Sequence, residues 1–336
     1  AVGKRSYQIP LTLEQVFLGK NLKKPVRQSE ALHSIGCKVA GKEVIKRAPR
    51  ITDVDIHSPK NLNEALELFS KGGYKLLAAG TDVIIELRME TKPVKLLNIY
   101  NLKSLKGIKK NKREVAVGAC VTFTEIVNNK YLQNNFPMFV KACSSIGSKQ
   151  IRNRATLGGN IINAAPCADS VPPLAIYDAK VVLKSKNRIR KVPIEDFILS
   201  GYKTDVKQGE ILTSIVIPKP KNKKYYTSYY QLGRRNAMNI TRLSVGVVMS
   251  FDKYNKVEEC RIVEGALLNK PMRLMEIENL LIGKEFTLSQ INKIEQPLKR
   301  IIDNEIGSRW SSEYKMPVFI NICKDVLKDI LTQVNN

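Results

Sequence analysis

The sequence contains few of the side chains that bind metals. Among 336 residues there are two histidines and six cysteines, which are widely spread with no Cys-x-x-Cys pair. This scarcity argues against a zinc site or an iron–sulfur cluster held by the chain alone. Isolated thiols are typical of a reducing compartment. No apolar run approaches the ~18 residues of a membrane span, and the start has no signal-peptide pattern. We therefore expect a cytoplasmic protein.

Acidic residues are also scarce. Lysine and arginine number 56 against 31 aspartates and glutamates, for a formal charge of +25. The basic residues are dispersed over apparent connecting segments, and no zinc-finger or RNP-type aromatic motif accompanies them. The charge therefore indicates a solvated surface and a docking face for acidic subunits, more than nucleic-acid binding. A Gly-x-Gly-x-x-Gly fingerprint is missing too, so a Rossmann site for NAD is not supported.

One stretch carries recognisable chemistry, from Lys149 to Asp169. Gly158 and Gly159 permit close backbone approach, and Thr156 and Asn160 flank them with groups that donate and accept hydrogen bonds. Backbone amides beside such groups can receive phosphate oxygens, and the carboxylate of Asp169 can take ribose or ribityl hydroxyls. A plain turn before a helix is the alternative interpretation.

A second stretch repeats this pattern. Leu76 to Asp82 reads as an apolar strand, a turn of small residues, a hydroxyl and a carboxylate, and a helix follows it. Two such loops could hold one nucleotide diphosphate from two sides.

Together the loops resemble the FAD-binding flavoprotein subunit of the molybdenum hydroxylases, the family of xanthine dehydrogenase, aldehyde oxidase and carbon monoxide dehydrogenase. Its signatures are similar to Ala-Gly-Gly-Thr-Asp and Gln-Ile-Arg-Asn-x-(Ala/Gly)-Thr-(Ile/Leu)-Gly-Gly-Asn. The second is complete through Asn160, and the first departs once, at Ala79, where a glycine is usual. The resemblance covers roughly residues 51 to 334.

The resemblance implies an α+β fold. A two-lobed FAD-binding domain of the vanillyl-alcohol oxidase and p-cresol methylhydroxylase type is expected at 51–220, with lobes at 51–110 and 111–220. A small α+β domain would follow at 221–336. Residues 1–50 form a basic N-terminal extension, either a tail or an arm that wraps a partner.

Local patterns predict the elements. We expect helices at 61–70, 82–90 and 137–145, strands at 75–79, 95–99 and 114–118, and a capping box from Thr122 to Glu125. Strands are expected at 180–185, 189–193, 211–217, 225–232, 243–251 and 257–266, and helices near 273–282, 288–303 and 316–334.

The resemblance also implies cofactor-binding residues, with the flavin in the cleft between the lobes. Residues of the first loop would hold the pyrophosphate, and those of the second loop would grip it from the other lobe. Asn163 and Asp169 would meet ribityl or ribose hydroxyls, Lys75 and Ile146 would lie at the adenine end, and Leu212 would pack on the flavin ring. The full expected set is Lys75, Leu76, Ala78, Ala79, Gly80, Thr81, Asp82, Val83, Ile146, Thr156, Gly158, Gly159, Asn160, Asn163, Asp169 and Leu212. No catalytic or metal-binding residue is expected.

The implied activity is that of an oxidoreductase subunit that transfers electrons. Partner subunits would carry the molybdenum cofactor and [2Fe–2S] clusters, and FAD would pass electrons to NAD or another acceptor. Xanthine or another N-heterocycle, an aldehyde or carbon monoxide would be oxidised elsewhere in the complex. Two other classes compete: a stand-alone FAD oxidoreductase of the same fold, and a basic protein that binds nucleic acid or a membrane surface.

Overall fold

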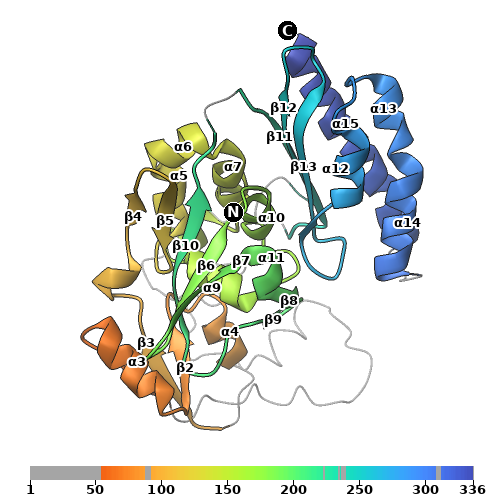
Figure 1. Cartoon of the computed structure of the whole chain (residues 1–336). Helices are drawn as coiled ribbons and strands as arrows, with labels where there is room; N and C mark the ends of the chain where they lie inside the picture. Colours follow the sequence, from red (N-terminus) through yellow and green to blue (C-terminus); the bar gives the residue numbers. More distant parts are fainter. Residues whose placement is uncertain are drawn as a thin grey trace, which may run out of the picture. The chain divides into compact units, whose positions relative to one another are not determined.

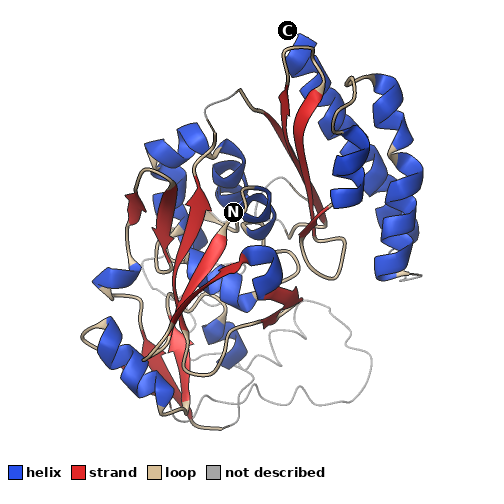
Figure 2. Ribbon diagram, viewed as in Figure 1, coloured by secondary structure: helices blue, strands red, loops and turns tan. Residues whose placement is uncertain are grey.

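The computed structural model describes residues 54–87, 92–221, 224–233, 235, 240–307 and 312–335. The predicted basic extension at 1–50 lies outside these residues. The described elements form three sheets with helices around them, plus a small two-stranded ribbon (Figures 1 and 2). Among the described residues, no helix is long and apolar enough to cross a membrane.

The first lobe is a small parallel sheet. Its elements are β1 (Val54–His57), α3 (Leu62–Ser70), β2 (Tyr74–Leu77), α4 (Val83–Leu87) and β3 (Val94–Asn98), with the strand order β1-β3-β2. Parallel strands need a crossover connection, and α3 supplies the one between β1 and β2, which lie on either side of β3. The helix begins at Asn61, whose side chain accepts a hydrogen bond from the Glu64 amide at 3.0 Å. Ala65 and Leu66 bury one face of α3 in the core of the lobe.

The second lobe is built on a five-stranded antiparallel sheet with the order β4-β5-β10-β6-β7. Its elements are η1 (Lys103–Leu105), β4 (Ile108–Lys110), β5 (Glu114–Gly118), α5 (Phe123–Asn128), α6 (Lys130–Asn135), α7 (Pro137–Ser145), α8 (Lys149–Arg152), α9 (Leu157–Asn163), α10 (Val171–Ile176), β6 (Lys180–Lys184), β7 (Ile189–Pro193), α11 (Ile194–Phe197), β8 (Ile198–Ser200), β9 (Lys203–Thr204) and β10 (Ile211–Pro218). The sheet begins at 108, just before the predicted lobe boundary, because β4 pairs with β5. Phe123, Phe139 and Leu157 are among the side chains that fill its core.

The C-terminal part is a second antiparallel sheet with a helical layer. Its elements are β11 (Tyr226–Leu232), β12 (Leu243–Phe251), β13 (Val257–Gly265), β14 (Met272–Arg273), α12 (Met275–Leu281), α13 (Leu288–Lys293), α14 (Glu295–Ile306) and α15 (Ser312–Asn335). The helix predicted at 288–303 is in fact two helices, with Ile294 between them. Phe319, Val326 and Ile330 of α15 belong to the core between this layer and the sheet.

Two glycines let the C-terminal sheet approach the second lobe closely. A Cβ on Gly246 of β12 would lie 2.7 Å from the Met138 sulfur, and one on Gly265 of β13 would lie 2.6 Å from Pro172. Helix α10 packs on β12 and β13 on the face away from α15, so β12 is buried on both sides (Figure 1). This explains why β12 reads as an almost continuous apolar run.

Candidate cofactor site

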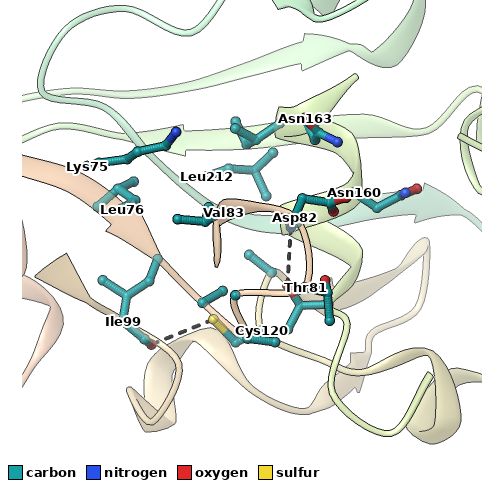
Figure 3. A pocket seen from close by; sticks show the side chains of 18 of the residues that line it. Lys75, Leu76, Thr81, Asp82, Val83, Ile99, Cys120, Asn160, Asn163 and Leu212 are labelled. Atoms are coloured by element: carbon teal, nitrogen blue, oxygen red, sulfur yellow. Dashed lines mark hydrogen bonds between the residues drawn. The ribbon is translucent and has the colours of Figure 1, made fainter. Parts of the chain in front are cut away.

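A single large cavity collects the predicted binding residues. It has a volume of about 910 Å³, near the upper end for small-molecule sites. All the predicted residues line it except Asp169. Residues of the first lobe face residues of the second across the space, with Lys75, Leu76 and Asp82 among the former and Asn160 and Leu212 among the latter (Figure 3).

The first loop is a turn with exposed donors. Gly80 has φ +79, and the neighbouring Ala79 is not among the residues with positive φ. Alanine is therefore compatible with the position where a glycine was expected, because the left-handed conformation falls one residue later. Among the described residues, no acceptor is paired with the backbone amides of Gly80, Thr81 or Asp82. These amides can bind phosphate oxygens just before α4.

Two carboxylates stand beside this turn. Burial raises the pKa of Asp82, and the charge of Glu86 one turn along raises it further. Glu86 itself forms an ion pair with Lys75 across the cavity wall, which ties α4 to β2. Both partners are about half exposed, so this pair contributes little to stability and can rearrange when a ligand enters.

The second loop differs from the predicted backbone nest. Its amides are already paired: Gly158 N–H donates to Ala119 O at 2.8 Å and Gly159 N–H to Thr156 Oγ1 at 3.2 Å. Thr156 caps α9, whose first turn contains both glycines. Gly158 permits a close approach of backbones, since a Cβ there would lie 2.7 Å from Ala119 O. This side of the cavity therefore offers side chains in place of free amides.

Polar side chains of α9 reach the cavity. Asn160 and Asn163 lie three residues apart, which places them on one face of the helix. The Ser170 hydroxyl donates to Asn160 Oδ1 at 2.7 Å and so fixes the orientation of that amide. Amide groups of this kind can donate to phosphate or accept from sugar hydroxyls.

Apolar residues complete the walls, and several of them carried no sequence signal. Leu212 is 4% exposed at a register shift in β10, beside the strand partner β6. Further lining comes from Phe69, Tyr74, Ile99, Cys120, Tyr202 and Val206. The Cys120 thiol donates to Ile99 O at 3.6 Å, and burial raises its pKa to about 12 (Figure 3). It is therefore a neutral wall group and not a nucleophile.

Asp169 does not line the cavity. It is 6% exposed, and its carboxylate accepts a hydrogen bond of 2.5 Å from the Thr241 hydroxyl, just before β12. Gln231 of β11 donates to the same hydroxyl oxygen. Burial raises the pKa of Asp169 to about 6, although the hydrogen bonds oppose the shift. In this structure Asp169 joins the second lobe to the C-terminal sheet.

The donor set fits a dinucleotide. Unpaired amides of one turn face hydroxyl and amide side chains of a capped helix, which suits a pyrophosphate and its adjoining sugars, and the apolar walls suit flat rings. Among the described residues there is no cluster of three or more potential metal ligands. Fold and site therefore define a two-lobed protein with a cavity suited to a dinucleotide and with an additional C-terminal domain.

Comparison with known families agrees with this class. Residues 52–220 match the family described as the FAD binding domain in molybdopterin dehydrogenase, and residues 228–330 match the CO dehydrogenase flavoprotein C-terminal domain. The chain belongs to this family of FAD-binding oxidoreductase components.

Individual relatives are similar over most of their length. The xanthine dehydrogenase FAD-binding subunit of Escherichia coli O157:H7 is 29% identical over 276 residues, which cover 81% of this chain and 94% of the relative. The nicotinate dehydrogenase FAD-subunit of Eubacterium barkeri is 29% identical over 292 residues, 84% of this chain and 97% of the relative. A chain of carbon monoxide dehydrogenase from Hydrogenophaga pseudoflava shares the fold, with a TM-score of 0.76 at 24% identity, over 83% of this chain and 98% of that one.

Proposed function

We propose that this chain is the electron-transferring FAD subunit of a cytoplasmic, multi-subunit molybdenum hydroxylase. The observation that carries the proposal is the cavity itself, in which two loops from different lobes face each other with complementary donors. The relatives support it, because those named as FAD-binding subunits or medium chains are matched almost end to end. FAD, when bound, supplies the redox chemistry.

The residues of the chain then bind and orient the cofactor. Amides of Gly80, Thr81 and Asp82 donate to the pyrophosphate from the first lobe, and the hydroxyl of Thr156 with the amide of Asn160 does so from the second. Asn163 meets sugar or ribityl hydroxyls. Leu212 packs against the flavin ring and excludes water from one of its faces. Lys75 and Ile146 lie at the adenine end.

Partners follow from the relatives. We propose that an iron–sulfur subunit and a molybdenum-cofactor subunit deliver electrons, with NAD as the acceptor and a xanthine-type N-heterocycle as the substrate of the complex. The relatives include enzymes named for xanthine, nicotinate, glyceraldehyde and carbon monoxide, so aldehyde- or carbon monoxide-oxidising complexes are the alternative assignments. A stand-alone FAD oxidoreductase is the second candidate function.

One preparation tests these assignments. The chain, expressed in its natural host with an affinity tag and purified, should be yellow. It should co-purify with an iron-containing and a molybdenum-containing subunit. Acid precipitation should release all flavin into the supernatant as FAD. A yellow chain that purifies alone and oxidises a substrate by itself would favour the stand-alone enzyme. Flavin retained in the pellet, or released as FMN, would contradict the proposed non-covalent FAD site.

Acceptor choice is tested on the same complex. With xanthine as the substrate, the assembled complex should reduce NAD. The rate should be higher than the rate at which the same complex reduces an artificial dye when NAD is left out. Turnover with the dye but none with NAD would exclude NAD as the acceptor.

A further inference from the structure

Arg190 does not line the cavity, but its side chain forms hydrogen bonds to both ends of a segment that makes up part of the cavity wall. Its Nε and Nη2 donate to the two carboxylate oxygens of Glu210, each at 2.7 Å. Its Nη1 donates to Asp205 Oδ2 at 2.6 Å, and Nη2 also donates to the Asp205 carbonyl oxygen at 2.5 Å. The guanidinium on β7 thus joins residues 205 and 210, the two ends of one short segment.

The segment between those ends forms part of the cavity wall. Val206, Lys207, Gln208 and Glu210 all line the cavity, whereas Arg190 does not. The Lys207 amide donates to Glu210 Oε2 at 2.8 Å, so the carboxylate that Arg190 holds also closes the turn. The fork-shaped, two-point contact with Glu210 is a strong form of charge-assisted hydrogen bond.

This wall segment also reaches the first lobe. A Cβ on Gly209, which has φ +77, would lie 3.6 Å from the Ser70 Cα at the end of α3. A Cβ on Gly72 would lie 3.8 Å from the Gln208 side-chain nitrogen. The segment therefore bridges the second lobe to the turn between α3 and β2 and lies beside the start of β2.

We propose that Arg190 is a positioning residue which, by holding the 205–210 segment against the cavity, sets the affinity of the chain for FAD. The proposal rests on the placement of FAD in this cavity. Without Arg190, the carboxylates of Asp205 and Glu210 lose the cation that joins them, and the Lys207 ammonium pairs with Asp205 and not with Glu210. Their mutual repulsion then favours opening of the segment.

The test is a comparison of FAD affinities. Flavin is removed from the full chain, and the dissociation constant for FAD is measured by fluorescence titration for the wild type, Arg190→Gln and Lys191→Gln. Lys191 is the matched control, since it is the next residue on β7 and its 3.4 Å pair with Glu114 is half exposed. Loss of these part-buried charged contacts should weaken FAD binding by about tenfold or more in Arg190→Gln. Lys191→Gln should match the wild type.

Tryptic cleavage after Lys207 gives a second readout, and it should be faster in Arg190→Gln. Unchanged FAD affinity in Arg190→Gln would overturn the role of Arg190. If Arg190→Gln does not fold, Asp205→Asn removes one of its two partners and should show the same loss of FAD affinity to a smaller degree; unchanged FAD affinity and unchanged tryptic cleavage in Asp205→Asn would count against the proposal. A wild type that fails to bind FAD would instead refute the placement of the cofactor.

Discussion

Thr122 and Thr156 pair as an isolated antiparallel bridge, and each caps the helix that follows it. The Phe123 amide donates to Ala155 O at 3.2 Å, and the Leu157 amide donates to Val121 O at 3.0 Å. The starts of α5 and α9 are therefore locked together. Only Thr156 lines the cavity. Both threonines thus cap helices, and Thr156 in addition faces the cavity.

Variants of Thr122 and Thr156 should separate effects on FAD binding from effects on the stability of the fold. Thr156→Ala and Thr122→Ala should each lower the free energy of unfolding by about 1 kcal/mol, because each removes a helix cap. Only Thr156→Ala should also raise the dissociation constant for FAD, by roughly tenfold, through the loss of a hydroxyl that faces the cavity. Urea denaturation and flavin titration of both variants check this. Equal effects on FAD binding would show that Thr156 acts only as a cap.

Adjacent glycines should respond differently to alanine. A Cβ on Gly158 would meet the backbone of Ala119, so Gly158→Ala should destabilise the fold by about 1–3 kcal/mol through overpacking. A Cβ on Gly159 would meet only the Thr156 hydroxyl, at 2.9 Å. Gly159→Ala should therefore fold with a smaller loss and bind FAD less tightly. Thermal melts of the flavin-free protein with flavin titrations measure both effects, and a reversed order would contradict the observed packing of α9.

The first loop allows a similar comparison. Ala79→Gly should leave FAD affinity unchanged, and it should cost up to about 1 kcal/mol of stability through greater freedom of the unfolded chain. Gly80→Ala should weaken FAD binding strongly, because φ is +79 and the new Cβ would lie 2.9 Å from the Ile84 side chain. Flavin content after purification reports on both variants. Tighter FAD binding in Ala79→Gly would mean that the departure from the family signature weakens the site.

Local sequence patterns predicted the strands and helices that are determined by their own side-chain periodicity and capping residues. The strands at 114–118 and 243–251 and the capping box from Thr122 to Glu125 are present as expected. The short helices α8 and α9 were not predicted as helices, because Gly-Gly-Asn has low helix propensity. Here the bridge to Thr122 and the Thr156 cap outweigh that propensity.

Contacts between distant residues could not be read from spacing. The motif positions indicated which residues share the cavity, since strand ends and helix starts lie at the same edge of each lobe. The direction of the Asp169 side chain depends on Thr241, 72 residues along the chain, and so the sequence did not reveal it. The grip of Arg190 on residues 205 and 210 depends likewise on how β7 and β10 are placed by the sheet.

Asp169 should give the protein a measurable pH dependence. Its pKa is raised from 3.8 to about 6 by burial, so the folded state binds the proton more tightly than the unfolded state. Stability from this group is therefore fully present below about pH 4 and is lost as the pH rises to about 6. A shift of this size corresponds to at most about 3 kcal/mol.

Asp169→Asn removes the titration while keeping an oxygen that can accept from Thr241. Relative to the wild type, the variant should gain free energy of unfolding between about pH 4 and pH 7, by up to about 3 kcal/mol. Urea denaturation of both proteins at several pH values measures the difference in their free energies of unfolding. The contributions of the other carboxylates are the same in both proteins and cancel in this difference. A constant difference between Asp169→Asn and the wild type would mean that Asp169 stays ionised in the folded protein because its hydrogen bonds outweigh its burial.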